Sequence, residues 1–167
     1  LERVGRMSGQ RFIGDHDWYR EGAEVLLKQQ DRVTGYWRGV GIEGNPQIAT
    51  ALALLYLSKG RRPVLISKLT HDEGTDWNRH RHDLVHLTQD VERRWKRDMT
   101  WQTIHGDRAS VRDLLETPVL YISGRDQLRL GEQQKRNLRE YVDQGGFVFV
   151  EACCQGAGFD RDFRQLM

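Results

Sequence analysis

Cysteine, proline and long apolar runs are all scarce in this sequence of 167 residues. Its two cysteines, Cys153 and Cys154, are neighbours, so they form neither a disulfide framework nor a Cys-x-x-Cys zinc knuckle. The longest apolar run, Ile48–Leu57, is about half of the ~20 residues that a membrane-spanning helix needs. A net charge of +2 lacks the positive excess typical of nucleic-acid-binding domains. The composition therefore favours a globular protein with no membrane span and no nucleic-acid partner.

Two helices are predicted in the first 60 residues. The first begins at the Asp15–Asp17 segment, where an aspartate can accept hydrogen bonds from the helix start, and extends to residue 30. The second covers Asn45–Gly60, with Asn at the N-cap, Pro at the first helical position and Gly just past the end. Because it is apolar nearly all round, we expect it to be buried and to pack against Trp18 and Leu26. In an isolated repeat without its neighbours, its outer face should be exposed or covered by another copy.

The segment between these helices carries a recognisable motif. Gln30–Trp37 reads Gln-Asp-Arg-Val-Thr-Gly-Tyr-Trp, and the small-residue helix Thr50–Leu57 follows it. This pattern resembles the Gln-Trp repeat of squalene-hopene cyclases and prenyltransferase β subunits. The resemblance implies a structural role, in which Gln and Trp tie successive helices together. The acidic Asp-x-Asp-Asp box of the cyclases is absent, since Asp15–Asp17 is better interpreted as a helix cap, and this argues against a terpenoid cyclase.

Strand and helix patterns alternate from residue 61 onward. The apolar, strand-like runs are Val64–Leu69, Met99–Ile104, Val119–Ile122 and Phe147–Val150. Helical stretches lie at about 78–97, 110–115, 131–144 and 159–167. This alternation predicts an α/β fold with a parallel sheet covered on both faces, a flavodoxin-like three-layer sandwich in strand order 2-1-3-4. It would be preceded by the α/α-repeat helical hairpin.

A second resemblance covers this part of the chain. Its motifs are Asp76–Asn78, Pro118–Gly124, Leu138–Phe147 and Phe159–Arg164. They resemble a bacterial family of domains of unknown function, related in fold to class I glutamine amidotransferases and found fused to cyclase-type repeats. The resemblance implies a fold and no activity. It predicts a terminal α/α repeat over residues 1–60 and an amidotransferase-like domain over 61–167, truncated at its C-terminus.

The predicted topology gathers polar residues at one edge of the sheet. Ligands of open parallel sheets bind beyond the carboxyl ends of the strands, where the strand order reverses. The loops 70–78 and 123–127 lie at that point, and the fourth strand delivers Glu151 to the same edge. We expect ligand-binding residues to be Asp76, Asn78, Ser123, Arg125 and Asp126, with His71 and Asp72 nearby. In the alternative interpretation, Asp76 or Asn78 only caps the next helix.

Cys154 is the candidate nucleophile. Ala152-Cys153-Cys154-Gln155-Gly156 follows the last strand and is similar to the strand-to-helix elbow on which amidotransferase-like enzymes place their nucleophile. The catalytic base would be His71, His105 or a residue beyond Met167. The alternative is an inert cysteine, because cysteine is among the most frequently buried residues.

No metal site and no cofactor are predicted. His82 and His86 have the i, i+4 spacing of shared metal ligands. The apolar stripe of their helix, which contains Leu84, Leu87 and Val91, places both histidines on the solvent side. No carboxylate or cysteine joins them at ligand spacing.

Two functions remain open at this stage. The first is a binding or scaffolding module whose strand-end cleft takes a small molecule, sugar or peptide, presented by the remaining repeats of a longer chain. The alternative is a cysteine-dependent hydrolase or amidotransferase-like enzyme that uses Cys154. Position 1 is not methionine and no leader is visible there, which suggests a piece of a longer protein, so localisation stays open.

Overall fold

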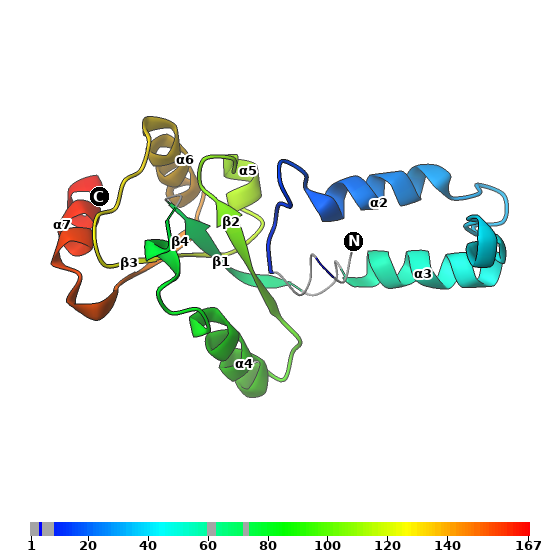
Figure 1. Ribbon diagram of the computed structural model, residues 1–167, viewed down its shortest axis with the longest axis horizontal. Helices are drawn as coiled ribbons and strands as arrows, with labels where there is room; N and C mark the ends of the chain where they lie inside the picture. Colours follow the sequence, from blue (N-terminus) through cyan, green and yellow to red (C-terminus); the bar gives the residue numbers. More distant parts are fainter. Residues whose placement is uncertain (1–3, 5–8, 60–62, 72–73) are drawn as a thin grey trace. The chain divides into compact units, whose positions relative to one another are not determined.

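The computed structural model describes residue 4 and residues 9–59, 63–71 and 74–167. The chain divides into two compact units, residues 1–62 and 63–167 (Figure 1). Three sequence-based expectations fall outside the described residues: the domain boundary between residues 60 and 61, the helix stop Gly60, and the polar residue Asp72.

The first unit is a helical hairpin. Helix α2 (Trp18–Gln29) and helix α3 (Pro46–Lys59) are joined by a turn that contains the 3-10 helix η1 (Gly41–Gly44). The predicted caps are confirmed, since the Asp17 carboxylate accepts a hydrogen bond from the N–H of Arg20 at 3.0 Å. The N–H of Gln47 likewise donates to Asn45 Oδ1 at 2.9 Å.

The core of this unit forms around Trp37. Its ring lies against Ala49 and Ala53 of α3, with Leu26 and Leu57 partly buried beside it. The indole Nε1–H donates to the carbonyl oxygen of Leu26 at 2.6 Å, which ties the turn to α2. The predicted packing of α3 against Leu26 is therefore confirmed.

Helix α3 is buried on one side, and its outer face is exposed, which is one of the two outcomes expected for a repeat without its neighbours. Among its described side chains, Ala49 and Ala53 are buried. Leucines 52, 54 and 55 are 47%, 53% and 55% exposed. The physical reason is that α2 covers one face of α3, and a single partner helix leaves the other faces to solvent.

The second unit is built on a four-stranded parallel sheet. Its strands are β1 (Val64–Thr70), β2 (Thr100–His105), β3 (Val119–Gly124) and β4 (Phe147–Ala152). Their order is β2-β1-β3-β4, and every neighbouring pair is parallel. The helices are α4 (Asp83–Trp95), α5 (Val111–Leu114), α6 (Glu132–Asp143) and α7 (Ala157–Leu166), with 3-10 turns η2 (Asp76–Asn78) and η3 (Cys153–Gln155).

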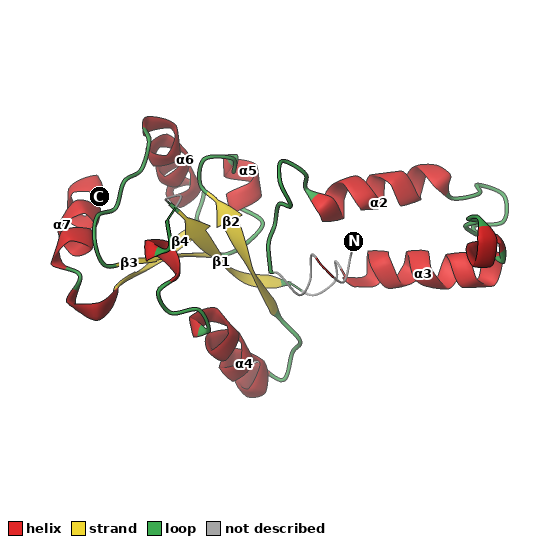
Figure 2. Ribbon diagram, in the orientation of Figure 1, coloured by secondary structure: helices red, strands yellow, loops and turns green. Residues whose placement is uncertain are grey.

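Helices cover both faces of the sheet. Figures 1 and 2 show α4 on one face and α5 and α6 on the other. Leu84 of α4 packs with Ile66 and Tyr121, whereas α6 turns Leu138 and Tyr141 inward. The predicted flavodoxin-like α/β sandwich, with its strand order, is confirmed. None of the helices in the described residues has the length and apolar character needed to cross a membrane.

Two details differ from expectation. The sheet was expected to be covered on both faces, but in β4, the edge strand of the predicted order, Phe147 is 62% and Phe149 45% exposed. An edge strand lacks a neighbour on one side, and α4 packs against β1 and β2 instead. Helix α4 begins at Asp83 rather than near residue 78, so the short turn Asp76–Asn78 stands apart from it and does not cap it.

Candidate active site

The cysteine pair lies in a turn between β4 and α7. Cys154 and Gln155 both have left-handed backbone angles, with φ of 54° and 62°, which is uncommon for residues other than glycine. Such conformations cluster at functional sites. The turn exposes Cys154 and buries Cys153, which is 3% exposed. Burial, followed by the neighbouring Cys154 thiol, raises the pKa of Cys153 to about 11, so that thiol stays protonated at neutral pH.

An imidazole lies next to the exposed thiol, and a carboxylate lies on the other side of that imidazole. His80 Nε2 lies 3.8 Å from Cys154 Sγ. The other ring nitrogen, Nδ1, lies 3.8 Å from Glu151 Oε1. His80 comes from the segment between η2 and α4, and Glu151 comes from β4. The spatial order is thiol, imidazole, carboxylate. A nucleophile, its base and the group that orients the base are arranged in this order in enzymes that use a thiol.

Tyr121 fixes the carboxylate. Its hydroxyl donates a short hydrogen bond to Glu151 Oε2, and its ring stacks on Phe149 with the ring centroids 5.4 Å apart. Burial and the hydrogen bond to Glu151 raise the pKa of Tyr121 well above its ordinary value, so the phenol remains a donor. Glu151 is therefore oriented from the neighbouring strand β3.

A buried lysine holds the loop that carries His80. Lys68, in the middle of β1, is 1% exposed. Its ammonium donates to Asn78 Oδ1 at 3.0 Å, to the carbonyl oxygen of His80 at 3.2 Å and to Asp83 Oδ2 at 2.6 Å. All three N–H donors of the ammonium are thus used. Lys68 positions His80 through the backbone.

Asp76 joins the loop after β1 to the loop after β3. Its Oδ2 accepts hydrogen bonds from the N–H groups of Arg125 and Asp126, at 3.0 Å and 3.2 Å. Arg79 bridges the Asp76 and Asp126 carboxylates. Burial alone would raise the pKa of Asp76, but the hydrogen bonds from Arg79, Arg125 and Asp126 together lower it below its ordinary value.

Glycines allow these loops to meet. A Cβ at Gly158, in the first turn of α7, would collide with the carbonyl oxygen of Asp126. A Cβ at Gly156 would lie 2.7 Å from the carbonyl oxygen of Arg125. The close approach of the β3–α6 loop to the start of α7 therefore requires residues without a side chain.

His71 and His105, the candidate bases predicted from the sequence, have other neighbours. His71 is 4% exposed, and its Nε2 lies 2.9 Å from the carbonyl oxygen of Ser123. The Ser123 hydroxyl in turn donates to the carbonyl oxygen of Trp77 at 2.9 Å. His105 ends β2, which is separated from β4 by two strands, or about 14 Å at the usual ~4.8 Å spacing. The imidazole beside the sulfur is that of His80.

The structure thus brings Asp76, Arg125 and Asp126 together and places Asn78 on Lys68. Sequence reasoning missed His80, Lys68 and Tyr121. A lysine inside an apolar strand run was a readable sign of a buried charge, because lysine is almost never buried unless paired. No sequence spacing predicts that His80 is the partner of Cys154, because the two residues are 74 positions apart.

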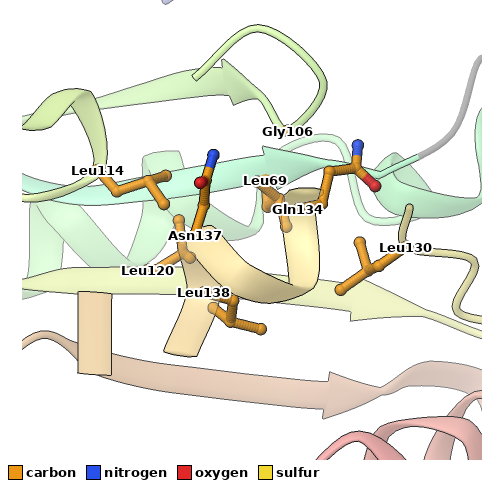
Figure 3. Close-up of a pocket in the computed structure, with 8 residues that line it drawn as sticks. All are labelled: Leu69, Gly106, Leu114, Leu120, Leu130, Gln134, Asn137 and Leu138. Carbon is orange, nitrogen blue, oxygen red and sulfur yellow. The ribbon is translucent and has the colours of Figure 1, made fainter. Parts of the chain in front are cut away.

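A small cavity lies away from this site, between α6 and the sheet (Figure 3). Its volume is about 10 Å³, room for one water molecule or less. It is lined mainly by leucines, namely Leu69, Leu114, Leu120, Leu130 and Leu138, together with Gly106, Gln134 and Asn137. None of the predicted site residues lines it, and it provides no argument for a ligand.

Fold and site together define a parallel-sheet α/β domain with an exposed thiol at its strand-to-helix turn. The family described as a domain of unknown function (DUF4159) matches residues 65–167, more than half of the chain, and the chain belongs to that family. The predicted membership of a family of domains of unknown function is thereby confirmed. Comparison with curated proteins found no match, and comparison with solved structures found none either.

Proposed function

We propose that the second unit is a cysteine-dependent hydrolase or acyl-transfer enzyme, with Cys154 as nucleophile and His80 as base. The observation that carries the proposal is the pair of 3.8 Å distances that join Cys154 Sγ to His80 Nε2 and His80 Nδ1 to Glu151 Oε1. Unliganded active sites commonly show such long contacts, which shorten when the reacting complex forms.

The chemistry is that of thiol catalysis. His80 Nε2 takes the proton from the Cys154 thiol, and the sulfur attacks the carbonyl carbon of an ester or amide. As the C–O or C–N bond breaks, the leaving group takes that proton from His80 and departs as an alcohol or amine. Water then attacks the thioester, with its proton passing through His80 to the sulfur, and the carboxylic acid is released. A nucleophile other than water would give acyl transfer.

The remaining groups position the base. Glu151 Oε1 lies 3.8 Å from His80 Nδ1, and a proton held on Nδ1 by that carboxylate would leave the Nε2 lone pair facing the sulfur. Tyr121 holds Glu151, and Lys68 holds the His80 backbone. Glu151, Tyr121 and Lys68 are positioning residues, because the proposed reaction takes place at Cys154 and His80.

The amidotransferase resemblance supports this proposal. In that fold the nucleophile occupies a strand-to-helix elbow, and Cys154 occupies the turn between β4 and α7. The substrate would lie across the strand ends, against Arg125 and Asp126, whose side chains are exposed at this edge. If the thiol proves inert, the same edge would serve the binding or scaffolding module considered above, with a small molecule, sugar or peptide as ligand.

For the first unit we propose a Gln-Trp-type repeat with a structural role. Two contacts support it. Gln30 Nε2 donates to the carbonyl oxygen of Gly35 at 2.9 Å, which closes the turn, and Trp37 donates to α2 through the carbonyl oxygen of Leu26. The motif residues thus tie helix and turn together, as the resemblance implies.

A reporter ester tests the enzyme proposal. The reduced chain, kept in a metal chelator, is mixed with 4-nitrophenyl acetate, and nitrophenolate release is followed together with the mass of the Cys154 peptide. We expect an acetyl group on Cys154 in the native chain and in Cys153→Ala, none in Cys154→Ala, and at least about tenfold slower acylation in His80→Gln. Acylation of Cys154 at an unchanged rate in His80→Gln would overturn the proposal.

A further inference from the structure

The turn that carries the proposed nucleophile also gathers three ligand atoms for a metal. A ring nitrogen of His80 and the sulfurs of Cys153 and Cys154 all lie within 4.8 Å of one another. Among the described residues, this is the one group of three or more histidine, cysteine, aspartate or glutamate side chains that lie close enough together to share an ion. We propose that His80, Cys153 and Cys154 together bind one Zn²⁺ ion.

The spacing suits tetrahedral zinc. Bonds of about 2.3 Å to sulfur and about 2.1 Å to nitrogen place two ligand sulfurs about 3.8 Å apart, and a sulfur about 3.6 Å from a nitrogen. The distance from Cys154 Sγ to His80 Nε2 is 3.8 Å, close to the second value. The three ligand atoms lie within 4.8 Å of one another, so the distances must shorten by about 1 Å or less to reach these values. His80 is 48% exposed and Cys154 is exposed, so both side chains have room to rotate.

The donor set and its surroundings select this ion. Two thiolates and one imidazole favour zinc over Mg²⁺ or Ca²⁺, which take oxygen ligands. The two thiolates also neutralise the charge of Zn²⁺. Glu151 at His80 Nδ1 supplies the carboxylate–histidine contact that commonly orients a metal-ligating histidine, and Tyr121 holds that carboxylate in turn. The fourth position would be filled from solvent on the exposed side.

Cys153 separates this inference from the proposed reaction. The reaction uses Cys154 and His80 and gives Cys153 no part, whereas the metal site needs all three. A bound Zn²⁺ would occupy both the nucleophilic sulfur and the base nitrogen, so the metal-bound and reactive forms exclude each other. The buried sulfur beside the nucleophile thereby gains a role that acyl chemistry does not give it.

Cobalt titration tests the site with a readout that does not depend on activity. Co²⁺ is added to the reduced 167-residue chain, absorbance is recorded, and Zn²⁺ is then added to displace it. We expect one Co²⁺ per chain, a thiolate-to-cobalt charge-transfer band, tetrahedral visible bands and displacement by Zn²⁺. The release of two protons as the thiols ionise should accompany binding.

Variants assign the ligands. Cys153→Ser, Cys154→Ser and His80→Gln should each weaken Co²⁺ affinity by at least about tenfold, and Glu151→Gln by about 10–100-fold. His82→Gln/His86→Gln is the matched control. Those exposed histidines stack with their ring centroids 6.2 Å apart and offer an adventitious site, so this variant should keep the charge-transfer band.

Two results would overturn the inference. One is the absence of a thiolate band in the native chain. The other is unchanged Co²⁺ affinity in Cys153→Ser while circular dichroism shows a native fold. If Cys153→Ser does not fold, Cys154→Ser in the exposed turn decides the matter in the same way. Acylation of Cys154 in chelator is measured separately, so the enzyme proposal stands or falls independently.

Discussion

Lys68 Nζ lies 2.6 Å from Asp83 Oδ2, although Lys68 sits in the middle of the central strand β1. The lysine side chain is 2% exposed and the aspartate side chain is 17% exposed. A buried ammonium is stable only when it is paired and hydrogen-bonded, and this one also binds Asn78 and the backbone of His80. One side chain thus links the sheet interior to the loop that presents the imidazole.

Replacing Lys68 with methionine should be costly, because the Asp83 carboxylate would lose its cation. We expect the free energy of unfolding to fall by about 3 kcal/mol, measured by urea denaturation. In the double variant Lys68→Met/Asp83→Leu part of this loss should return, since no charge is left unpaired. If the loss of unfolding free energy in the double variant equals the sum of the losses in Lys68→Met and Asp83→Leu, the two side chains are not coupled.

The free energy of unfolding should depend on pH through Asp76. Its folded-state pKa is lowered, so its contribution is complete above the unfolded value of about 3.9 and is lost as pH falls through the folded value. Asp76→Asn should cost about 2 kcal/mol at pH 7, because a charged acceptor of two backbone N–H groups is lost. The difference in the free energy of unfolding between the native chain and Asp76→Asn should be smaller at pH 3 than at pH 7. Urea midpoints at both pH values measure it, and a constant gap would refute the role of the charge.

Gly158 should resist substitution. A methyl group there meets the carbonyl oxygen of Asp126, so Gly158→Ala should lower the free energy of unfolding by about 1–3 kcal/mol as the loop is displaced. Gly131→Ala is the matched control at another helix start, where the nearest atom, Gln134 Oε1, lies 3.7 Å from the added carbon. Its cost should stay under about 1 kcal/mol. Equal effects of the two variants in thermal melts would contradict the close approach.

Trp37 should stabilise the helical hairpin in two separable ways. Trp37→Phe removes the hydrogen bond to the carbonyl oxygen of Leu26 and should cost about 1 kcal/mol. Trp37→Ala also empties the space against Ala49 and Ala53 and should cost about 3–5 kcal/mol. Amide hydrogen exchange of α3 measures both, with β1 as internal reference. Equal exchange rates in the two variants would mean that ring packing contributes nothing.

Local patterns were enough to predict the sheet. Runs such as Val119–Ile122 are apolar and β-branched, and the helical segments between them force parallel crossovers, so strand order and direction followed. Burial depends on neighbours, and local pattern could not supply it. Leu52 and Phe147 are apolar, yet they are 47% and 62% exposed.

The candidate site was predictable in part for the same reason. Topology alone placed Cys154 and the loop of Asp76 at the strand ends, and the structure agrees on that placement. The partner of Cys154 depends on how an irregular loop folds back. Tertiary hydrogen bonds from Lys68 fix that loop, and no sequence period records them.

The activation of Cys154 by His80 is tested most directly by alkylation rates. The reduced chain in chelator is treated with iodoacetamide at neutral pH, and modification of each cysteine is followed by peptide mass. Cys154 should react at least about tenfold faster than the buried Cys153. His80→Gln should slow Cys154 by at least about tenfold, while His82→Gln leaves its rate unchanged. Equal rates for Cys154 in the native chain and in His80→Gln would contradict the proposed thiol–imidazole pair.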